Sequence, residues 1–147
     1  MTVEKVFIEQ QIIDAIWKLL LGRVNELLGD MQYNIPSIES GECGGNSIIP
    51  VIALVSCERT EKERIIFFDT YSLSIIFSLQ ETPESELFCY AYAASVCKVL
   101  QENPTLGGIA DRAVITGKKY VPPKKPYCGE GWGLAITVRI TVEGMAV

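Results

Sequence analysis

The sequence predicts an α+β fold, in which a mainly antiparallel sheet of four to five strands carries two packed helices. Two long stretches, residues 4–28 and 83–102, repeat apolar residues at helical spacing. The segments between and after them alternate with a period of two, as strands do. The resulting order is α-β-β(-β)-α-β-β. Strands joined as hairpins, with helices inserted between them, favour an antiparallel sheet with its helices on one face.

Length and charge limit the classes of protein to consider. At 147 residues the chain is expected to form a single domain over residues 1–147. Its net charge of −5 argues against a nucleic-acid partner, sequence-specific or general. No apolar run reaches the roughly 18 residues that a membrane span needs, and the N-terminus lacks a basic-then-apolar signal pattern. We therefore expect no membrane partner and a cytosolic location, or one in an assembly built there.

The residues of common catalytic and metal sites are scarce. The chain has no histidine, which removes the commonest general base and the Ser/His and Cys/His pairs. Its five cysteines form no CxxC pair, so neither a zinc site nor a disulfide framework is expected. An enzyme or ligand-binding domain would have to use scattered groups, which form no motif: Asp69, Glu58 and Lys118 or Lys119. We expect no enzyme, no cofactor and no catalytic residue.

Residues 4–28 are expected to form one long helix with Gly29 at its C-terminal cap. Its wide apolar stripe either covers the sheet alone or also contacts another subunit. Residues 30–47 are rich in Gly, Ser, Asn and Pro and predict a long loop. The glycines of this loop lack the pattern of a phosphate-binding loop.

Two strands are expected before the second helix. Residues 48–58 are apolar on both faces, which predicts a strand covered on both sides. Residues 59–64 alternate in charge and are interpreted as a solvated turn. Residues 65–79 form one long strand, or two strands with Asp69 marking a turn or a bulge between them.

The second helix is expected over residues 83–102. Thr82 is a candidate N-cap, and Pro83 suits the first helical position. The stretch from Leu87 to Val99 is almost wholly apolar, which indicates a helix buried on more than one side. Either the first helix or a neighbouring subunit would cover the side that faces away from the sheet.

The residues that end this helix form the most distinctive turn of the sequence. Asn103 and Pro104 stop the helix, because proline lacks an N–H and disfavours the α region before it. After Thr105, Leu106 is the one apolar anchor, and Gly107-Gly108 permit backbone angles that side chains forbid. The turn either reverses the chain with Leu106 in the protomer core or contacts a partner directly.

The second hairpin holds the one basic patch of this acidic chain. A short strand, residues 113–116, leads into a loop or extended arm, residues 117–131, and a final alternating strand spans residues 134–143. The arm is either a partner-contacting element or a solvated hairpin tip. Its candidate contact residues are Lys118, Lys119, Tyr120, Lys124, Lys125 and Tyr127.

The chain from about residue 98 to 142 resembles the tail terminator or tail completion proteins of tailed bacteriophages, including prophage-encoded ones. The resemblance is carried by a helix that runs into Asn103-Pro104-Thr105-Leu106-Gly107-Gly108, a strand, a variable loop and the final strand. The preceding order of an N-terminal helix and a β-meander also matches.

The resemblance implies a noncatalytic protomer that forms a hexameric ring on the head-proximal end of the tail tube. The ring would stop tube polymerisation and contact the head connector, so the expected partners are further copies of the chain, the tail tube protein and the head connector proteins. The expected location is the virion tail, assembled in the host bacterial cytoplasm. Another head–tail joining or minor tail component is the alternative.

Overall fold

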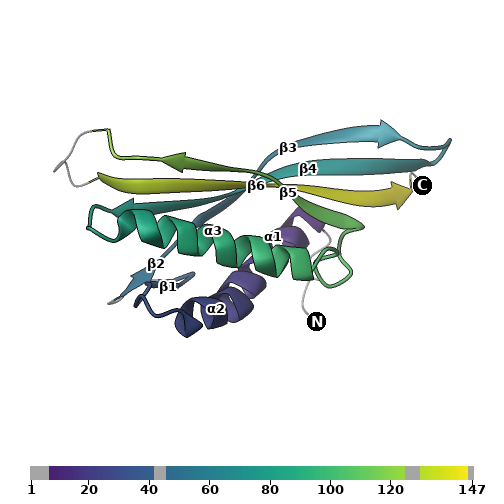
Figure 1. Cartoon of the computed structure of the whole chain (residues 1–147). Helices are drawn as coiled ribbons and strands as arrows, with labels where there is room; N and C mark the ends of the chain where they lie inside the picture. The colour runs from purple at the N-terminus through teal and green to yellow at the C-terminus, as the bar shows by residue number, and fades with distance from the viewer. Residues whose placement is uncertain (1–6, 42–45, 125–129, 146–147) are drawn as a thin grey trace.

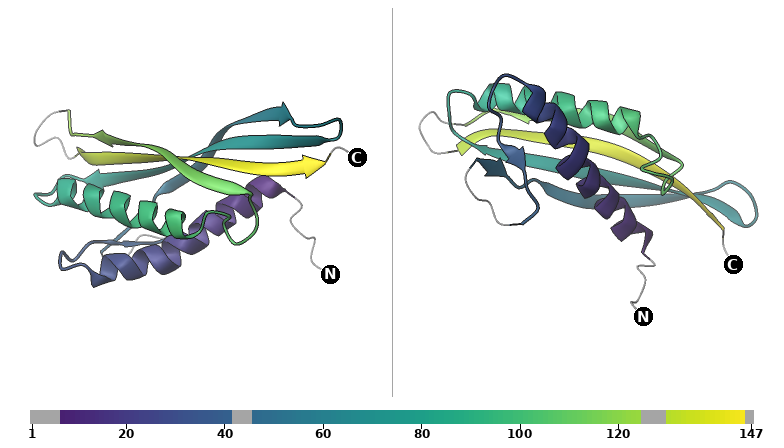
Figure 2. Two further views of the ribbon diagram at one scale, coloured as in Figure 1. Left: turned by 45° about the vertical axis from the view of Figure 1, so that its right-hand side comes forward. Right: turned by 90° about the horizontal axis from the view of Figure 1, so that it is seen from below.

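The computed structural model describes residues 7–41, 46–124 and 130–145, and it has the predicted α+β fold. A layer of helices covers one face of a four-stranded antiparallel sheet (Figures 1 and 2). The elements in chain order are α1 (Ile8–Leu19), η1 (Leu20–Val24), α2 (Asn25–Asp30), β1 (Ser37–Ile38), β2 (Ser47–Ile48), β3 (Val51–Glu61), β4 (Ile66–Gln80), α3 (Ser85–Glu102), β5 (Arg112–Val121) and β6 (Glu130–Met145).

The order of strands in the main sheet is β3-β4-β6-β5, and all neighbours are antiparallel. The two central strands are therefore β4 and β6, while β3 and β5 form opposite edges. A separate two-stranded parallel sheet joins β1 to β2, and all of its residues except Ile48 lie in the stretch that was expected to be a loop.

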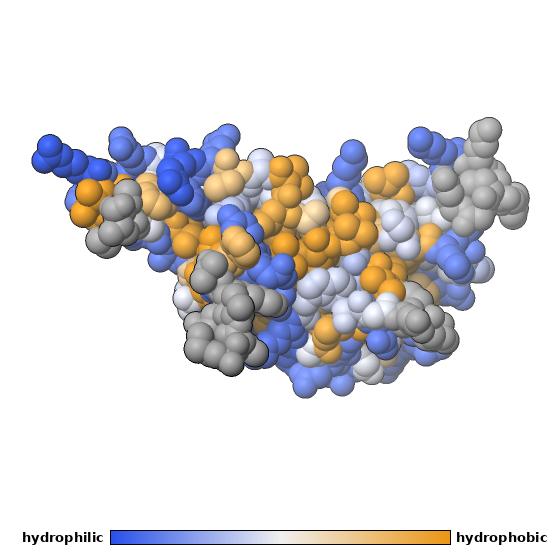
Figure 3. All heavy atoms as spheres, turned by 180° about the vertical axis from the view of Figure 1, so that it is seen from behind, coloured by the Kyte–Doolittle hydropathy of each residue, from blue (hydrophilic) through white to orange (hydrophobic). Residues whose placement is uncertain are grey.

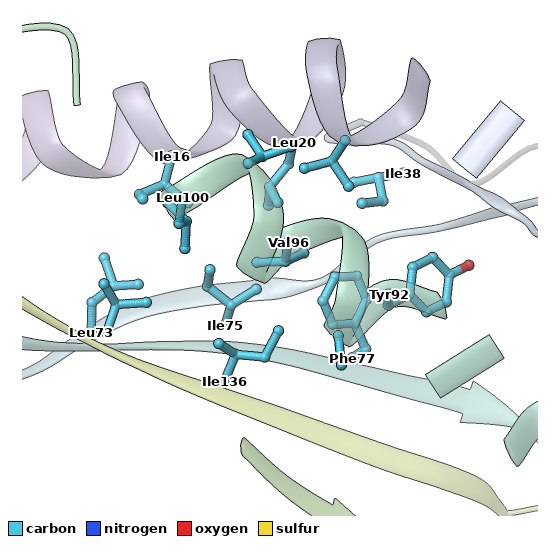
Figure 4. Close-up of a cluster of buried hydrophobic side chains, with 14 of the residues drawn as sticks. Ile16, Leu20, Ile38, Leu73, Ile75, Phe77, Tyr92, Val96, Leu100 and Ile136 are labelled. Carbon is cyan, nitrogen blue, oxygen red and sulfur yellow. The ribbon is translucent and has the colours of Figure 1, made fainter. Parts of the chain in front are cut away.

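The core lies between the sheet and the helices. Alternate residues of β4 and β6 point toward the helices and are fully buried, among them Leu73, Ile75 and Ile136. Phe77 stacks on Tyr92 of α3 with 4.7 Å between ring centroids (Figure 4). Burying a side chain of this size contributes about 1.5–3 kcal/mol, and the buried apolar residues of the described chain form one cluster between the two layers.

The first helix runs without a break from Ile8 to Asp30 but contains one π-helical turn, η1. The N–H of Asn25, just after η1, bonds to Gly22 O instead of the carbonyl four residues back. The Asn25 side-chain amide donates to that carbonyl, Leu21 O, at 3.2 Å. The same side chain holds the backbone of Ile38 through two hydrogen bonds of 2.8 and 2.9 Å. The cap expected at Gly29 is wrong, because α2 continues to Asp30.

The prediction that the first strand is covered on both sides is wrong. β3 is an edge strand, shifted to Val51–Glu61, and most of its residues are exposed. A bulge at Val55 also breaks its alternation, so that Leu54 pairs with Leu73 but Ser56 pairs with Ser72. Because a bulge adds one residue to one strand, Cys57 lies on the helix-facing side rather than on the side of Val51.

The long strand and the second helix differ from prediction only in detail. β4 is one continuous strand, and Asp69 is neither a turn nor a bulge, since it pairs in register with Arg59. α3 begins at Ser85 rather than Pro83. The Thr82 N–H donates to Ser85 Oγ at 2.8 Å, and the Ser85 N–H donates to Thr82 O at 3.2 Å, a reciprocal arrangement that fixes the helix entry.

The turn after α3 is held by hydrogen bonds at both ends. The Asn103 side-chain amide donates to Val99 O at 2.8 Å, and Pro104 O accepts the N–H of Ala113 at 2.7 Å. Leu106 is buried although its φ is 51°, a region that non-glycine residues rarely adopt. Gly107 and Gly108 have φ of 75° and 93°, which confirms the expected glycine backbone conformation.

The strand expected at residues 113–116 is longer than predicted. β5 extends to Val121, so Lys118, Lys119 and Tyr120 are strand residues and not part of a loop. A bulge at Thr116 explains the difference, because it shifts the alternation just before Gly117 and the two lysines.

The turn conformation predicts the effect of a single methyl group. Gly108→Ala should lower the free energy of unfolding by about 1–2 kcal/mol, because an L-residue is strained at positive φ even where a Cβ meets no neighbour. Urea unfolding measures the change. Gly22→Ala is the matched control, since its Cβ also meets open space without positive φ; it should raise stability by about 0.5–1 kcal/mol. Equal effects in the two variants would contradict a backbone origin.

Candidate functional site

The edge strand β3 carries apolar side chains that nothing in the described part of the chain covers. Val51 is 59% exposed and Val55 is 66% exposed. Ile49, just before β3, and Ile76, the β4 partner of Val51, are exposed as well. Figure 3, which shows the molecule from behind on the side where β3 lies, has a band of hydrophobic residues across it. We refer to Ile49, Val51, Val55 and Ile76 as the β3 patch.

The opposite edge of the sheet carries part of the predicted arm. Lys118 and Lys119 are exposed on β5, and Lys124 is exposed after it. Tyr120 packs edge-on against Tyr90 of α3, with 5.5 Å between ring centroids, so its ring has a contact within the same chain. Lys125 and Tyr127 lie outside the described residues. The arm therefore begins as an ordered strand rather than as a loop.

The predicted turn, Asn103 to Gly108, lies beside the first helix. Leu106 belongs to the core, while Gly107 borders a groove of about 720 Å³. Ala15, Leu19, Gly22 and Ile109 contribute to the same groove. The turn from Asn103 to Gly108 therefore connects α3 to β5 with Leu106 in the core, and part of its outer surface lines the groove.

The hairpin of β3 and β4 is stiffened by one arginine. Arg59 pairs with both carboxylate oxygens of Asp69, at 2.7 and 2.9 Å, and lies 3.7 Å from the ring centroid of Phe67. Phe67 in turn packs on Gly144, where an added Cβ would come within 2.8 Å of the ring. The hydrogen bond from Arg59 lowers the pKa of Asp69 below its ordinary value of 3.8. These contacts tie the C-terminal half of β3 to β4 and, through Phe67, to β6.

The scattered polar residues that could have served an enzyme are not brought together. Glu58 lies on edge strand β3, whereas Lys118 and Lys119 lie on β5, across the full width of the sheet. Asp69 is committed to Arg59. In the part of the chain that the structure describes, no group of His, Cys, Asp and Glu is placed to hold a metal.

The described cysteines offer little reactive thiolate. Burial raises the pKa of Cys89 to about 11, and burial is also the main reason that the pKa values of Cys57 and Cys97 are raised. None of the helices among the described residues has the length and apolar character to cross a membrane. The least covered features of the described chain are the two edges of the sheet and the groove beside the turn.

The β3 patch was missed by sequence reasoning for a specific reason. An apolar pattern on both faces indicates that a strand is suited to burial, but it does not say whether the same chain or another one covers it. The bulge at Val55 has no sequence signal such as glycine.

Comparison with protein-family models and with curated protein sequences found no match for this chain.

The contact between Arg59 and Asp69 predicts a dependence of stability on pH. Asp69→Asn should reduce the free energy of unfolding at pH 7 by about 1 kcal/mol or less, since the pair is partly exposed. Because the folded-state pKa of Asp69 is lowered, its contribution is complete above the ordinary pKa of 3.8 and is lost as the pH falls through the lower value.

Unfolding of the wild type and of Asp69→Asn, followed from pH 7 to pH 2, should therefore give curves that converge in acid. Glu63→Gln, in the exposed turn after β3, is the control and should run parallel to the wild type. A difference that stays constant down to pH 2 would show that Asp69 acts through something other than its charge.

Proposed function

We propose that this protein is a structural assembly protein of a tailed bacteriophage or prophage, a tail terminator. In this proposal, copies of the chain form a ring, of six subunits, that caps the tail tube and joins it to the head connector. The ring would be part of the virion tail after assembly in the host cytoplasm. The turn from Asn103 to Gly108 and the order of the elements support the assignment to this family.

The uncovered β3 patch is the observation that carries the proposal. An edge strand presents unpaired N–H and C=O groups, and natural monomers usually protect such an edge with charge, proline or a covering loop. Here the first half of β3 instead exposes Val51 and Val55. Exposed apolar patches are typical of sites of association, and Figure 3 shows a hydrophobic band on this side of the molecule. A protomer of an assembly would cover this edge with another subunit.

The net charge of the chain is compatible with a ring through which DNA passes. The net charge of −5 gives the body of the protomer an acidic balance. Acidic walls repel phosphate and would keep DNA from adhering to the channel. Catalysis plays no part in the proposal.

Electron microscopy of the purified protein with tail tubes of the same virus tests this function. A ring seated on one end of the tube is expected, and tails assembled without the protein should lose control of their length. A species that stays monomeric when concentrated and does not bind tubes would overturn the proposal. Binding to the portal stack instead of the tube end would assign the protein to another head–tail joining position.

A positive charge placed in the β3 patch should prevent ring formation without unfolding the protomer. Val55→Lys is suited to this test because the side chain is mostly exposed, so its effect on the free energy of unfolding should stay within about 0.5 kcal/mol. Mass photometry should then show protomers where the wild type shows rings. Tyr33→Lys, at an exposed aromatic residue after α2, is the control and should still form rings. Rings of normal size from Val55→Lys would contradict a role for β3 in assembly.

A further inference from the structure

The two edges of the sheet differ in charge as well as in position. β5 carries Arg112, Lys118 and Lys119 and has no acidic residue between Arg112 and Val121. None of these three cations forms an ion pair with another residue in the described part of the chain. The β5 edge is thus a line of positive charge on an acidic protein.

The β3 edge has the opposite character. Its one cation, Arg59, is occupied by Asp69. Glu58 and Glu61 are exposed, and neither forms an ion pair with another described residue. Two copies that met through the same edge, β3 to β3 or β5 to β5, would bring like charges together. Contact between β3 of one copy and β5 of another would bring unlike charges together.

We propose that the β5 edge of a second copy of this chain covers the β3 patch, in a head-to-tail contact repeated around the ring. The inference rests on the proposed ring-forming function and names the surface that builds the ring. A head-to-tail contact uses two different surfaces of each protomer, so it generates a ring when the rotation closes.

The register of the sheet places the two edges in matching positions. One row across the sheet runs from Glu58 through Thr70 and Thr141 to Arg112. In a ring whose axis runs parallel to the strands, rotation moves a subunit sideways and leaves every row at its own height. Glu58 of one copy would then face Arg112 of the next.

The apolar residues match in the same way. Val51 lies in the row that ends at Lys119, through Ile76 and Ala135. Val121, two residues beyond Lys119, is 42% exposed. Tyr90 of α3 is 48% exposed and packs on Tyr120, which brings a second apolar surface to this end of β5. The β3 patch of one copy would meet Val121 and the aliphatic stem of Lys119 in the next copy.

A regular hydrogen-bonded ladder is not expected between the two edges. β3 has its bulge at Val55 and β5 has its bulge at Thr116, and both bulges adjoin the row that joins Leu54, Leu73, Val138 and Ile115. Bulges interrupt pairing and twist an edge. Side chains, and above all the pair Glu58 and Arg112, would therefore decide the affinity and the salt dependence of the contact.

Charge reversal with rescue tests the contact. Glu58→Arg and Arg112→Glu should each raise the concentration needed for half-assembly by about tenfold, since each places like charges opposite one another. The double variant Glu58→Arg/Arg112→Glu should return to within about threefold of the wild type. Assembly is measured by mass photometry over a dilution series, and thermal unfolding confirms that each variant is folded. Glu39→Arg, an equal change of charge in the loop after β1, is the control and should assemble like the wild type.

The outcomes separate this contact from the function on which it rests. If all variants form rings and cap tubes as the wild type does, or if the double variant assembles no better than the single ones, the contact between β3 and β5 is wrong while the tail terminator function stands. Variants of Glu58 that form normal rings but no longer bind tubes would show that the tube covers β3, which also overturns the contact. A wild type that neither assembles nor binds tubes would remove both proposals.

Discussion

The pairing of β4 with β6 is the constraint on which the rest of the structure depends. These two strands contribute facing pairs to the core, Leu73 with Val138, Ile75 with Ile136 and Phe77 with Leu134. Because a strand alternates its side chains, one face of this pair is apolar from Leu73 to Phe77 of β4 and must be covered. α3 and the first helix cover it, and the two remaining strands can only attach at the outside. The edge positions of β3 and β5 are therefore a consequence of the pairing of β4 with β6 in the core.

The parts of the fold that could be predicted from the sequence are those whose pattern is local. β4, β6 and α3 each bury a face that repeats regularly, so their existence and their order followed from periodicity. The length of β5 and the faces of β3 did not, since each strand contains a bulge that shifts its alternation by one residue. Leu106 shows a different limit: burial in the core compensates for a backbone conformation that its residue type disfavours.

The candidate surfaces were predicted only in part. The lysines were identified as a basic patch, and the glycines of the turn were identified as backbone requirements. The apolarity of β3 was visible in the sequence, but it was interpreted as burial within the protomer. Whether an apolar strand is central or at an edge depends on strand order, which arises from long-range pairing and not from the strand itself. Only the topology shows that β3 and β5 lie on opposite edges.

The bulges also limit how strands of other molecules can pair with an exposed apolar edge. An edge that offers a continuous ladder of hydrogen bonds accepts any other strand and can extend without limit. The bulges at Val55 and Thr116 interrupt both ladders near the middle of the sheet. Association then depends on the fit of side chains and on the sign of charge, which select one partner and one direction. Under the proposed contact, the irregularities that obscured the strands in the sequence are what would make an assembly of limited size possible.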